Sequence, residues 1–237
     1  MIAGAGLEIR FDKATLQLGH FRIDADVAFP AGKITALIGP SGSGKSTLLA
    51  AIAGFVVPKS GLISIGSTEM NAIAPGLRPV TMVFQDYNLF PQINVSQNVG
   101  LGLRPSLKLG KADTIAIDAV LDRVGLLGMG SRSPASLSGG QIGRVALARA
   151  LLRNRPVLLL DEPFAALGPA LRHDMLDLVA EVQTERALTV LLVTHLPDDA
   201  TRIAALTAVV SGGLVSDPVE TNQLFDDPPS SLREYLG

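Results

Sequence analysis

The fold of this chain is decided by the stretch Gly39-Pro40-Ser41-Gly42-Ser43-Gly44-Lys45-Ser46-Thr47. It fits the pattern G-x-x-x-x-G-K-[ST], and it lies between an apolar run at Ile34–Ile38 and a helical pattern at Lys45–Ala53. Glycines let a backbone wrap around phosphate groups with its N–H groups pointing inward, and the start of a helix adds partial positive charge. The stretch therefore predicts a phosphate-binding loop between a strand and a helix.

Side chains in and beyond this loop suit a nucleoside triphosphate such as ATP with Mg²⁺. Lys45 would reach the β- and γ-phosphates, and the Ser46 hydroxyl would ligate Mg²⁺. Asp161 and Glu162 follow the apolar run Leu158–Leu160, at the end of a strand where ligands meet an open α/β sheet. Asp161 suits Mg²⁺ through a water, and Glu162 suits polarising an attacking water. The alternative for these two carboxylates is a solvated acidic turn.

Short apolar runs alternate with helical patterns along the chain. Most of these runs lack polar alternation, as expected of strands that are covered on both faces. We expect strands at Ile34–Ile38, Val80–Phe84, Val157–Leu160, Thr189–Val193 and Leu206–Val210, and helices at Lys45–Ala53, Ala170–Glu185 and Asp198–Ala204. This alternation predicts an α/β fold with a mostly parallel sheet and crossover helices.

Two regions depart from that alternation. Polar and apolar residues alternate over Leu7–Leu18 and Phe21–Phe29, which predicts an N-terminal antiparallel β layer. Residues 86–155 have helical periodicity and no convincing strand, so we expect a helical subdomain inserted between two strands of the sheet. The single domain 1–237 would then consist of a catalytic core, residues 1–85 and 156–237, and this helical subdomain. We also expect a short terminal helix after Pro229.

Composition excludes several classes of protein. The 237 residues are 47% hydrophobic and 18% charged, which is typical of one globular core. A net charge of −2 provides no basic field for nucleic acid, and the absence of cysteine excludes disulfides and thiolate metal sites. We expect no transmembrane helix, because no run of about 18 apolar residues occurs, and the opening residues lack the pattern of a signal peptide.

A second glycine-containing motif, Leu137-Ser138-Gly139-Gly140-Gln141, precedes a long helical pattern. Ser138 and Gln141 have the spacing of a capping box. The two glycines would leave backbone N–H groups accessible, so this helix start could bind an anion that another molecule presents. A plain helix cap is the alternative.

Four motifs occur in a characteristic order: the phosphate loop, the LSGGQ motif, the apolar strand that ends in Asp-Glu, and Thr194-His195. Together they resemble the ATP-binding subunit of ABC transporters. The resemblance covers essentially the whole chain and implies a P-loop NTPase fold. It also implies a homodimer that sandwiches two ATP molecules, each between the phosphate loop of one chain and the LSGGQ motif of the other. Gln85 matches a glutamine that is implied to sense Mg²⁺ and the γ-phosphate and to couple to membrane subunits. His195 matches a histidine that is implied to contact the γ-phosphate and to orient the water or Glu162.

The same resemblance implies partners and a location. The implied partners are transmembrane permease subunits and, indirectly, a periplasmic solute-binding protein. Nucleic acid is not an implied partner. The location is the cytoplasmic face of the bacterial inner membrane, with peripheral attachment. ABC-type ATPases of DNA repair or translation are the competing class, but they need a long coiled-coil insertion or two tandem modules, and this sequence has neither.

A narrower resemblance concerns the cargo. Phe84–Phe90, Asn98–Leu103 and Leu107–Leu109 are similar to the corresponding stretches of the ATP-binding subunits of thiamine importers, which implies thiamine or thiamine pyrophosphate. Importers of iron, sulfate, molybdate or polyamines share much of the pattern and remain alternatives.

Three positions depart from the family pattern. Ile142 and Gly143 stand where Arg and Gln are usual, and Gly168 stands where an aspartate is implied to link the two ATP sites. Glycine has no side chain for this link, so we expect ATP binding with weakened or less cooperative hydrolysis. A nucleotide-dependent clamp that barely hydrolyses ATP is the corresponding alternative function.

Two further contacts stay open at this point. The aromatic residue that stacks on adenine is missing near Leu18, and Phe21 and Phe11 are the alternatives. The apolar stretch Tyr87–Pro91 is either part of the surface that docks to the membrane subunits or part of the core of the helical subdomain.

Overall fold

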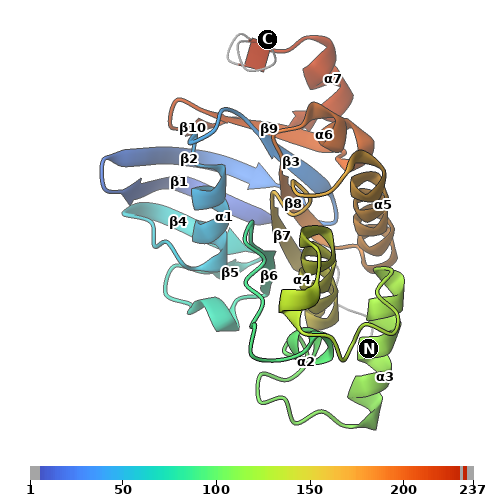
Figure 1. Cartoon of the computed structure of the whole chain (residues 1–237). Coiled ribbons are helices and arrows are strands. Elements are labelled where there is room, and N and C mark those ends of the chain that lie inside the picture. Colours follow the sequence, from blue (N-terminus) through green and yellow to red (C-terminus); the bar gives the residue numbers. More distant parts are fainter. Residues whose placement is uncertain (1–5, 230–231, 234–237) are drawn as a thin grey trace.

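Five parallel strands form the centre of the molecule. The computed structural model describes residues 6–229, 232 and 233 (Figure 1). The strands are β3 (Ile34–Ile38), β6 (Val80–Val83), β7 (Val157–Asp161), β8 (Thr189–Val193) and β9 (Leu206–Ser211). They pair in parallel in the order β9-β3-β8-β7-β6, and every residue of β3, β7 and β8 is buried. The expected strands are confirmed, within one residue at their ends.

An antiparallel layer continues this sheet. It contains β1 (Ile9–Leu18), β2 (Phe21–Phe29), β4 (Ser60–Ile65) and β5 (Thr68–Glu69). The short strand β10 (Leu214–Val215) joins this layer to the parallel strands, because it pairs in parallel with β2 and antiparallel with β9. The whole order is β5-β4-β1-β2-β10-β9-β3-β8-β7-β6, and β11 (Val219–Glu220) pairs with the start of β9, whereas β10 pairs with its end. The hairpin of β1 and β2 agrees with the alternating pattern of their residues, because one face of each strand is buried.

Four helices accompany the sheet. They are α1 (Lys45–Ala53), α5 (Pro169–Arg186), α6 (Pro197–Ile203) and α7 (Thr221–Asp226). The expected helix at Lys45–Ala53 is confirmed to the residue, and the two expected later helices are confirmed within one residue. Proline at the first position of α5 and α6 suits a helix start, since its missing N–H would have no partner there.

Three helices lie between β6 and β7. They are α2 (Val95–Gly100), α3 (Lys111–Arg123) and α4 (Gly139–Arg153), with a short 3₁₀ turn at Pro134–Ser136. All residues of this stretch are described, and none of them forms a strand. In Figure 1 these helices extend from one end of the sheet, below α5.

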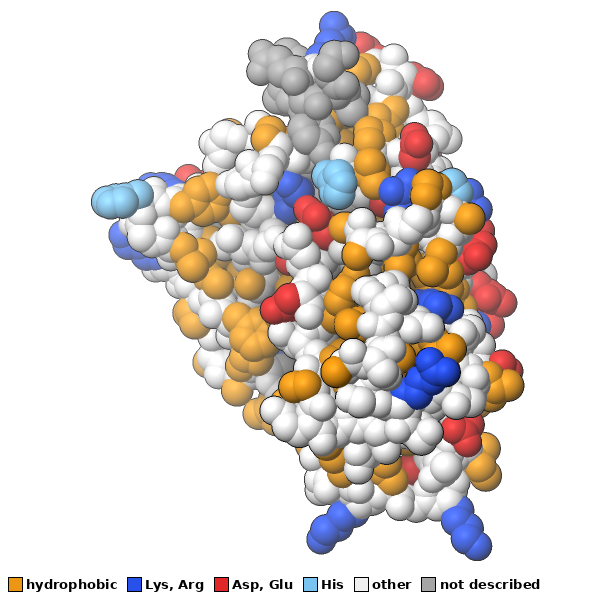
Figure 2. Space-filling view, in the orientation of Figure 1, with side chains coloured by type: hydrophobic (Ala, Val, Ile, Leu, Met, Phe, Trp, Pro, Cys, Tyr) orange, Lys and Arg blue, Asp and Glu red, His pale blue; other side chains and the backbone are white. Residues whose placement is uncertain are grey.

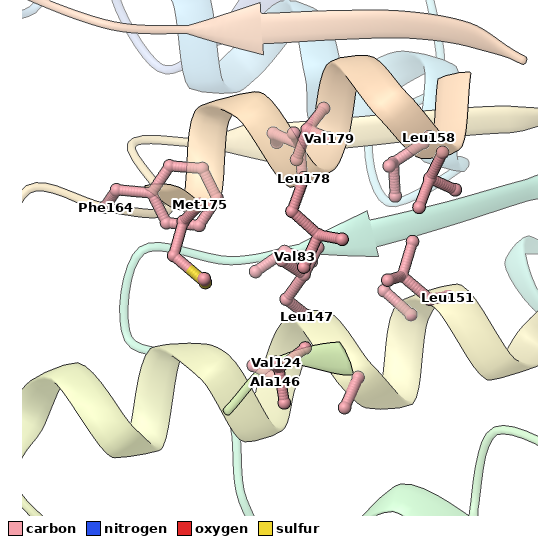
Figure 3. Close-up of a cluster of buried hydrophobic side chains, with 14 of the residues drawn as sticks. Val83, Val124, Ala146, Leu147, Leu151, Leu158, Phe164, Met175, Leu178 and Val179 are labelled. Carbon is pink, nitrogen blue, oxygen red and sulfur yellow. The ribbon is translucent and has the colours of Figure 1, made fainter. Parts of the chain in front are cut away.

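The sheet separates two hydrophobic cores. Leu158 and Leu160 of β7 point to the side of α4 and α5, where Figure 3 shows Leu147 of α4 and Val179 of α5 in the same cluster of buried side chains. Val157 and Leu159 of the same strand point to α1 and the antiparallel layer. The apolar run of β7 has no polar alternation because both of its faces are covered.

A buried arginine fixes the far end of α1. Arg78 is 1% exposed and donates to the carbonyl oxygens of Ala51 and Ile52, both at 2.8 Å. It also donates to Met70 and Ile73 on the following segment. A cation is favourable at the negative end of a helix dipole, so Arg78 anchors the helix that begins at the phosphate loop.

Some elements were not expected from the sequence. β4, β5, β10, β11 and α7 are short or depend on a neighbouring strand for their pairing. The first five residues lie outside the described residues. Of the stretch after Pro229, where we expect a terminal helix, only residues 232 and 233 are described. Among the residues that the structure describes, no helix is both long and apolar enough to cross a bilayer.

Candidate functional site

The predicted site residues of the core collect at one edge of the sheet. The phosphate loop follows β3, Gln85 follows β6, Glu162 follows β7, and His195 follows β8. Because these strands are parallel, their carboxyl ends meet at the same edge. Figure 2 shows basic, acidic and histidine side chains close together in the upper middle of the visible face, where β3, β7 and β8 end.

The phosphate loop has a conformation that requires its glycines. Gly39, Gly42 and Gly44 have φ of 145°, 76° and 104°, the left-handed range that side chains avoid. A Cβ on Gly39 would collide with the carbonyl oxygen of Val210. The loop can therefore curl tightly only because these positions are glycine.

The same loop offers unsatisfied donors to an anion. Gly44 caps α1 without a side-chain hydrogen bond, so the first N–H groups of the helix have no cap. The buried Ser43 hydroxyl has no hydrogen-bond partner in the described structure. Buried polar groups need partners, and a phosphate oxygen would supply them.

Lys45 is held inside the loop. It is 6% exposed, and its Nζ donates to the carbonyl oxygens of Gly39 and Pro40 at 2.8 and 2.9 Å. Burial lowers the pKa of Lys45, and the nearby charges of Glu162 and Asp161 act in the opposite direction. A third N–H of the ammonium group is left for an anionic ligand.

Ser46 and Asp161 form a pair of oxygen ligands. The Ser46 hydroxyl donates to Oδ1 of Asp161 at 2.9 Å. Burial raises the pKa of Asp161, and the hydrogen bond from Ser46 lowers it in part. The described residues contain no group of three or more His, Cys, Asp or Glu that would hold a metal by themselves. The hydroxyl and carboxylate oxygens fit Mg²⁺, whose remaining ligands would be phosphate and water oxygens.

Glu162 and His195 meet beside this pair. Nδ1 of His195 lies 3.4 Å from Oε2 of Glu162, and the histidine side chain is half exposed. Glu162 has a left-handed φ of 46°, and its N–H donates to the carbonyl oxygen of Val193. Non-glycine residues in this conformation are often part of a functional site, because the surrounding structure must hold them there. A carboxylate beside an imidazole is suited to accepting a proton from water.

Two residues that contact the segment of His195, Arg172 and Asp199, were not predicted from the sequence. Thr194 donates to the buried Asp199 at 2.8 Å, and Asp199 forms an ion pair with Arg172 at 3.1 Å. Arg172 lies in the first turn of α5, which follows the loop of Glu162, and Asp199 lies in α6, which follows His195. The pair therefore ties together the two loops that carry Glu162 and His195. The sequence signal for this pair was an aspartate in the first turn of a helix.

The LSGGQ motif begins α4. The Ser138 hydroxyl accepts from the N–H of Gln141, and the Gln141 side chain accepts from the N–H of Ser138, which is the expected capping box. Ser138 and Gly139 are exposed. The nearest neighbours of the two glycines are Ala166 and Leu167, in the loop that follows Glu162.

The structure also reduces the number of residues that could stack on adenine. Phe11 is fully buried and packs edge-on against Phe29, so it is not available to a ligand and that alternative is wrong. Leu18 is 47% exposed. The Phe21 ring lies against Gly44 of the phosphate loop, where it leaves no space for a Cβ.

Fold and site together define a P-loop protein that binds and hydrolyses a nucleoside triphosphate. Residues 23–165 match the family model described as ABC transporter, and the chain belongs to that family. It is an ATP-binding subunit whose ATP hydrolysis is coupled to transport.

Similar proteins agree on this family. The chain is 53% identical to the "Thiamine import ATP-binding protein ThiQ" of Mesorhizobium japonicum, over 99% of this chain and 93% of the relative. It is 52% identical to the protein of the same name from Cereibacter sphaeroides, over 97% and 99%. A solved dimeric structure of the ATP-binding cassette MJ0796, in a post-hydrolysis state with ADP and Pi, has a TM-score of 0.80 and 28% identity over 90% of this chain and 98% of that chain.

Proposed function

We propose that this chain is the ATP-hydrolysing subunit of an importer for thiamine or thiamine pyrophosphate. The observation that supports this cargo is the identity of about half of all residues, over nearly the full chain, to two proteins named for thiamine import. The subunit would act as a homodimer on membrane permease subunits, at the cytoplasmic face of the inner membrane, with a periplasmic solute-binding protein that delivers the cargo.

The phosphates of ATP would lie in the loop Gly39–Thr47. The N–H groups of the loop and Lys45 would neutralise their charge, and Leu18 and Phe21 would lie beside the base. Ser46 and Asp161, with Gln85 from the same edge, would hold Mg²⁺, which supplies further charge neutralisation when it is bound. In this arrangement the chain positions the phosphates more than it reacts with them.

Glu162 would polarise the water that attacks the γ-phosphate. His195 lies within 3.4 Å of the glutamate and would orient both the glutamate and the water. Ser138, Gly139, Gly140 and Gln141 of a second chain would complete each site, because this helix start is exposed and carries accessible N–H groups. Binding of ATP would therefore close the dimer, and hydrolysis would open it.

A groove between the sheet and the helices would receive the permease. Its volume is about 430 Å³, and its lining includes Phe55, Phe84, Phe90 and Arg149. Phe55 and Phe90 are both more than half exposed. Figure 2 shows hydrophobic side chains between the β4–β6 side and the α2–α4 side of this face. An amphipathic permease segment with an acidic side chain suits a groove that is apolar and contains arginine. Residues 86–155 would move with it as a helical subdomain.

A second function, a clamp that binds ATP and barely hydrolyses it, is favoured by one observation. Gly168 precedes α5 with φ of −65°, and a Cβ there would meet nothing within 4 Å. An aspartate would therefore fit this position, and the chain lacks it. Phosphate release separates the two functions, because a clamp would give the same background rate with and without Glu162→Gln.

The decisive experiment is uptake of labelled thiamine by source cells whose only copy of this chain carries Lys45→Ala. Lys59→Ala is the matched control, since Lys59 is exposed and its side chain donates to the exposed Gln17, away from the phosphate loop. We expect loss of uptake with Lys45→Ala and normal uptake with Lys59→Ala, at equal protein levels. Unchanged uptake with Lys45→Ala would exclude thiamine as the required cargo.

A further inference from the structure

The loop between β6 and α2 has a strained turn. Tyr87 and Asn88 have φ of 61° and 47°, so two consecutive non-glycine residues are left-handed. Arg149 of α4 donates to the carbonyl oxygens of both, at 2.7 and 2.8 Å. The turn is therefore held against α4 by a side chain of that helix.

This turn directs one aromatic ring into the protein. Gln85, Asp86 and Asn88 are exposed, whereas Tyr87 is only 8% exposed. Its desolvated hydroxyl has a raised pKa because of burial. The left-handed backbone thus places the Tyr87 ring on the opposite side of the loop from its neighbours.

Gly143 of α4 provides the space for the ring. A Cβ on Gly143 would lie 3.1 to 3.2 Å from Cε1, Cζ and Oη of Tyr87, which is closer than ordinary carbon contacts. Glycine weakens the interior of a helix, so its presence in α4 needs a local reason. Contact with the ring is that reason, and it explains one of the departures from the family pattern.

The loop and α4 connect two parts of the molecule. Phe84, Asn88 and Phe90 of the loop line the groove, as does Arg149. Gly143 lies four residues after Gly139, which is about one helical turn from the exposed start of α4. A group bound in the groove and an anion bound at the helix start would therefore touch the same packed unit.

We propose that Tyr87, packed into the space at Gly143, is a positioning residue that couples the groove to the start of α4. The inference rests on the proposed docking of a permease in the groove. A shift of the loop would push the ring against α4 and move the helix start relative to the nucleotide of the partner chain.

A double-mutant cycle on the isolated full-length chain tests the contact. Gly143→Ala should lower the melting temperature by at least about 2 °C, because the methyl group meets the ring. In a Tyr87→Ala background the same change should raise it by about 2 °C, since alanine favours a helix over glycine. Gly110→Ala is the control, because its Cβ would meet only Asp113, at 3.8 Å. Equal effects of Gly143→Ala in both backgrounds would overturn the contact.

Coupling is measured with the chain assembled with its permease in vesicles. We expect Tyr87→Ala and Gly143→Ala to lower thiamine uptake per ATP hydrolysed by at least about 5-fold, with unchanged ATP affinity of the isolated chain. Tyr87→Phe should keep normal coupling, because the ring still fills the space. Unchanged uptake per ATP in Tyr87→Ala would overturn the proposal.

The two proposals fail in different ways. If the unmodified transporter takes up no thiamine, the proposed cargo is wrong. Hydrolysis that the permease stimulates then replaces uptake as the readout of coupling, and loss of this stimulation in Tyr87→Ala but not in Tyr87→Phe still supports the role of the ring. Equal stimulation in the two variants would contradict it.

Discussion

The phosphate loop and the start of α4 are both glycine-rich helix N-termini, and they differ in how far their own chain surrounds them. At the phosphate loop, Lys45 is buried and bonded to the loop, and the Ser46 hydroxyl donates to Asp161 at the end of β7. At α4, Ser138 caps its own helix, and Gly139 is exposed. The first terminus is largely enclosed by its own chain, and the second is an exposed surface.

The comparison shows two ways in which a fold uses a helix dipole. A site that is lined mostly by one chain can bind its ligand before a second chain associates. A surface that needs a second chain can respond to association, so ligand binding and dimer closure become linked. Four predictions sharpen or break this comparison.

The largest effect should come from the site at the phosphate loop. Glu162→Gln removes the carboxylate that would polarise water, and general-base contributions are typically about 10²- to 10⁴-fold. We expect phosphate release to fall by about this factor while ATP affinity is retained, as measured by release and equilibrium binding assays. Glu181→Gln, on the exposed surface of α5, is the control. A rate within about two-fold of the unmodified chain would remove Glu162 from the proposed mechanism.

The second effect concerns the α4 surface. Gly139→Asp should fold normally, since its Cβ would meet only Ala166, at 4.0 Å, and an acidic residue favours a helix start. The added charge should repel phosphate and lower hydrolysis by roughly 100-fold, the effect of losing a preorganised donor. Gly139→Ala should keep most of the activity.

Mixing variants tests whether the second chain supplies this surface. A heterodimer of Gly139→Asp and Lys45→Ala chains contains one intact site if the phosphate loop of one chain works with α4 of the other. We expect hydrolysis by the mixture to exceed that of either variant alone. If each chain completed its own site, the mixture would stay inactive, and the comparison between the two helix starts would be wrong.

A smaller effect is expected at Gly168, the position where an aspartate would link the two ATP sites. Gly168→Asp restores a side chain at the N-cap of α5, where the backbone φ of −65° accepts any residue. We expect hydrolysis to rise by about 5-fold and the free energy of unfolding by a few tenths of a kcal/mol. Steady-state phosphate release and urea unfolding measure the two changes, and an unchanged rate would show that Gly168 does not limit hydrolysis.

The smallest effect is on stability and depends on pH. Because the folded state raises the pKa of Asp161, its charged form costs stability above that pKa, and this cost disappears as the pH falls. Asp161→Asn should therefore raise the melting temperature near pH 7, with a smaller difference at acidic pH, when nucleotide and metal are absent.

Asp177→Asn is a control that should change the melting temperature in the opposite direction. Its hydrogen bond to Arg202 lowers the pKa of Asp177, so the charged form contributes stability above the ordinary pKa. We expect a lower melting temperature near pH 7 for this variant. The same direction of change in both variants would contradict the argument from burial.

The sequence was informative wherever a function depends on neighbours along the chain. The phosphate loop, α1 and the capping box at Ser138 are local patterns, and each was located to the residue. The parallel strands could be predicted because both of their faces are buried, which leaves long apolar runs.

Such local patterns could not predict contacts between segments that are far apart in the sequence. The strand β4 is defined by pairing with β1, β5 by pairing with β4, and β10 by pairing with β2 and β9. Short strands have weak patterns of their own, so their partners decide whether they form.

The sequence alone thus determined the α/β class and the place of the phosphate loop, and it predicted the roles of Lys45, Ser46, Asp161 and Glu162. Only the tertiary structure decided that His195 meets Glu162, that Arg172 and Asp199 tie their loops together, and that Tyr87 fills the space at Gly143. The physical reason is that these contacts join residues that are far apart in the sequence, and packing of the sheet against its helices brings them together.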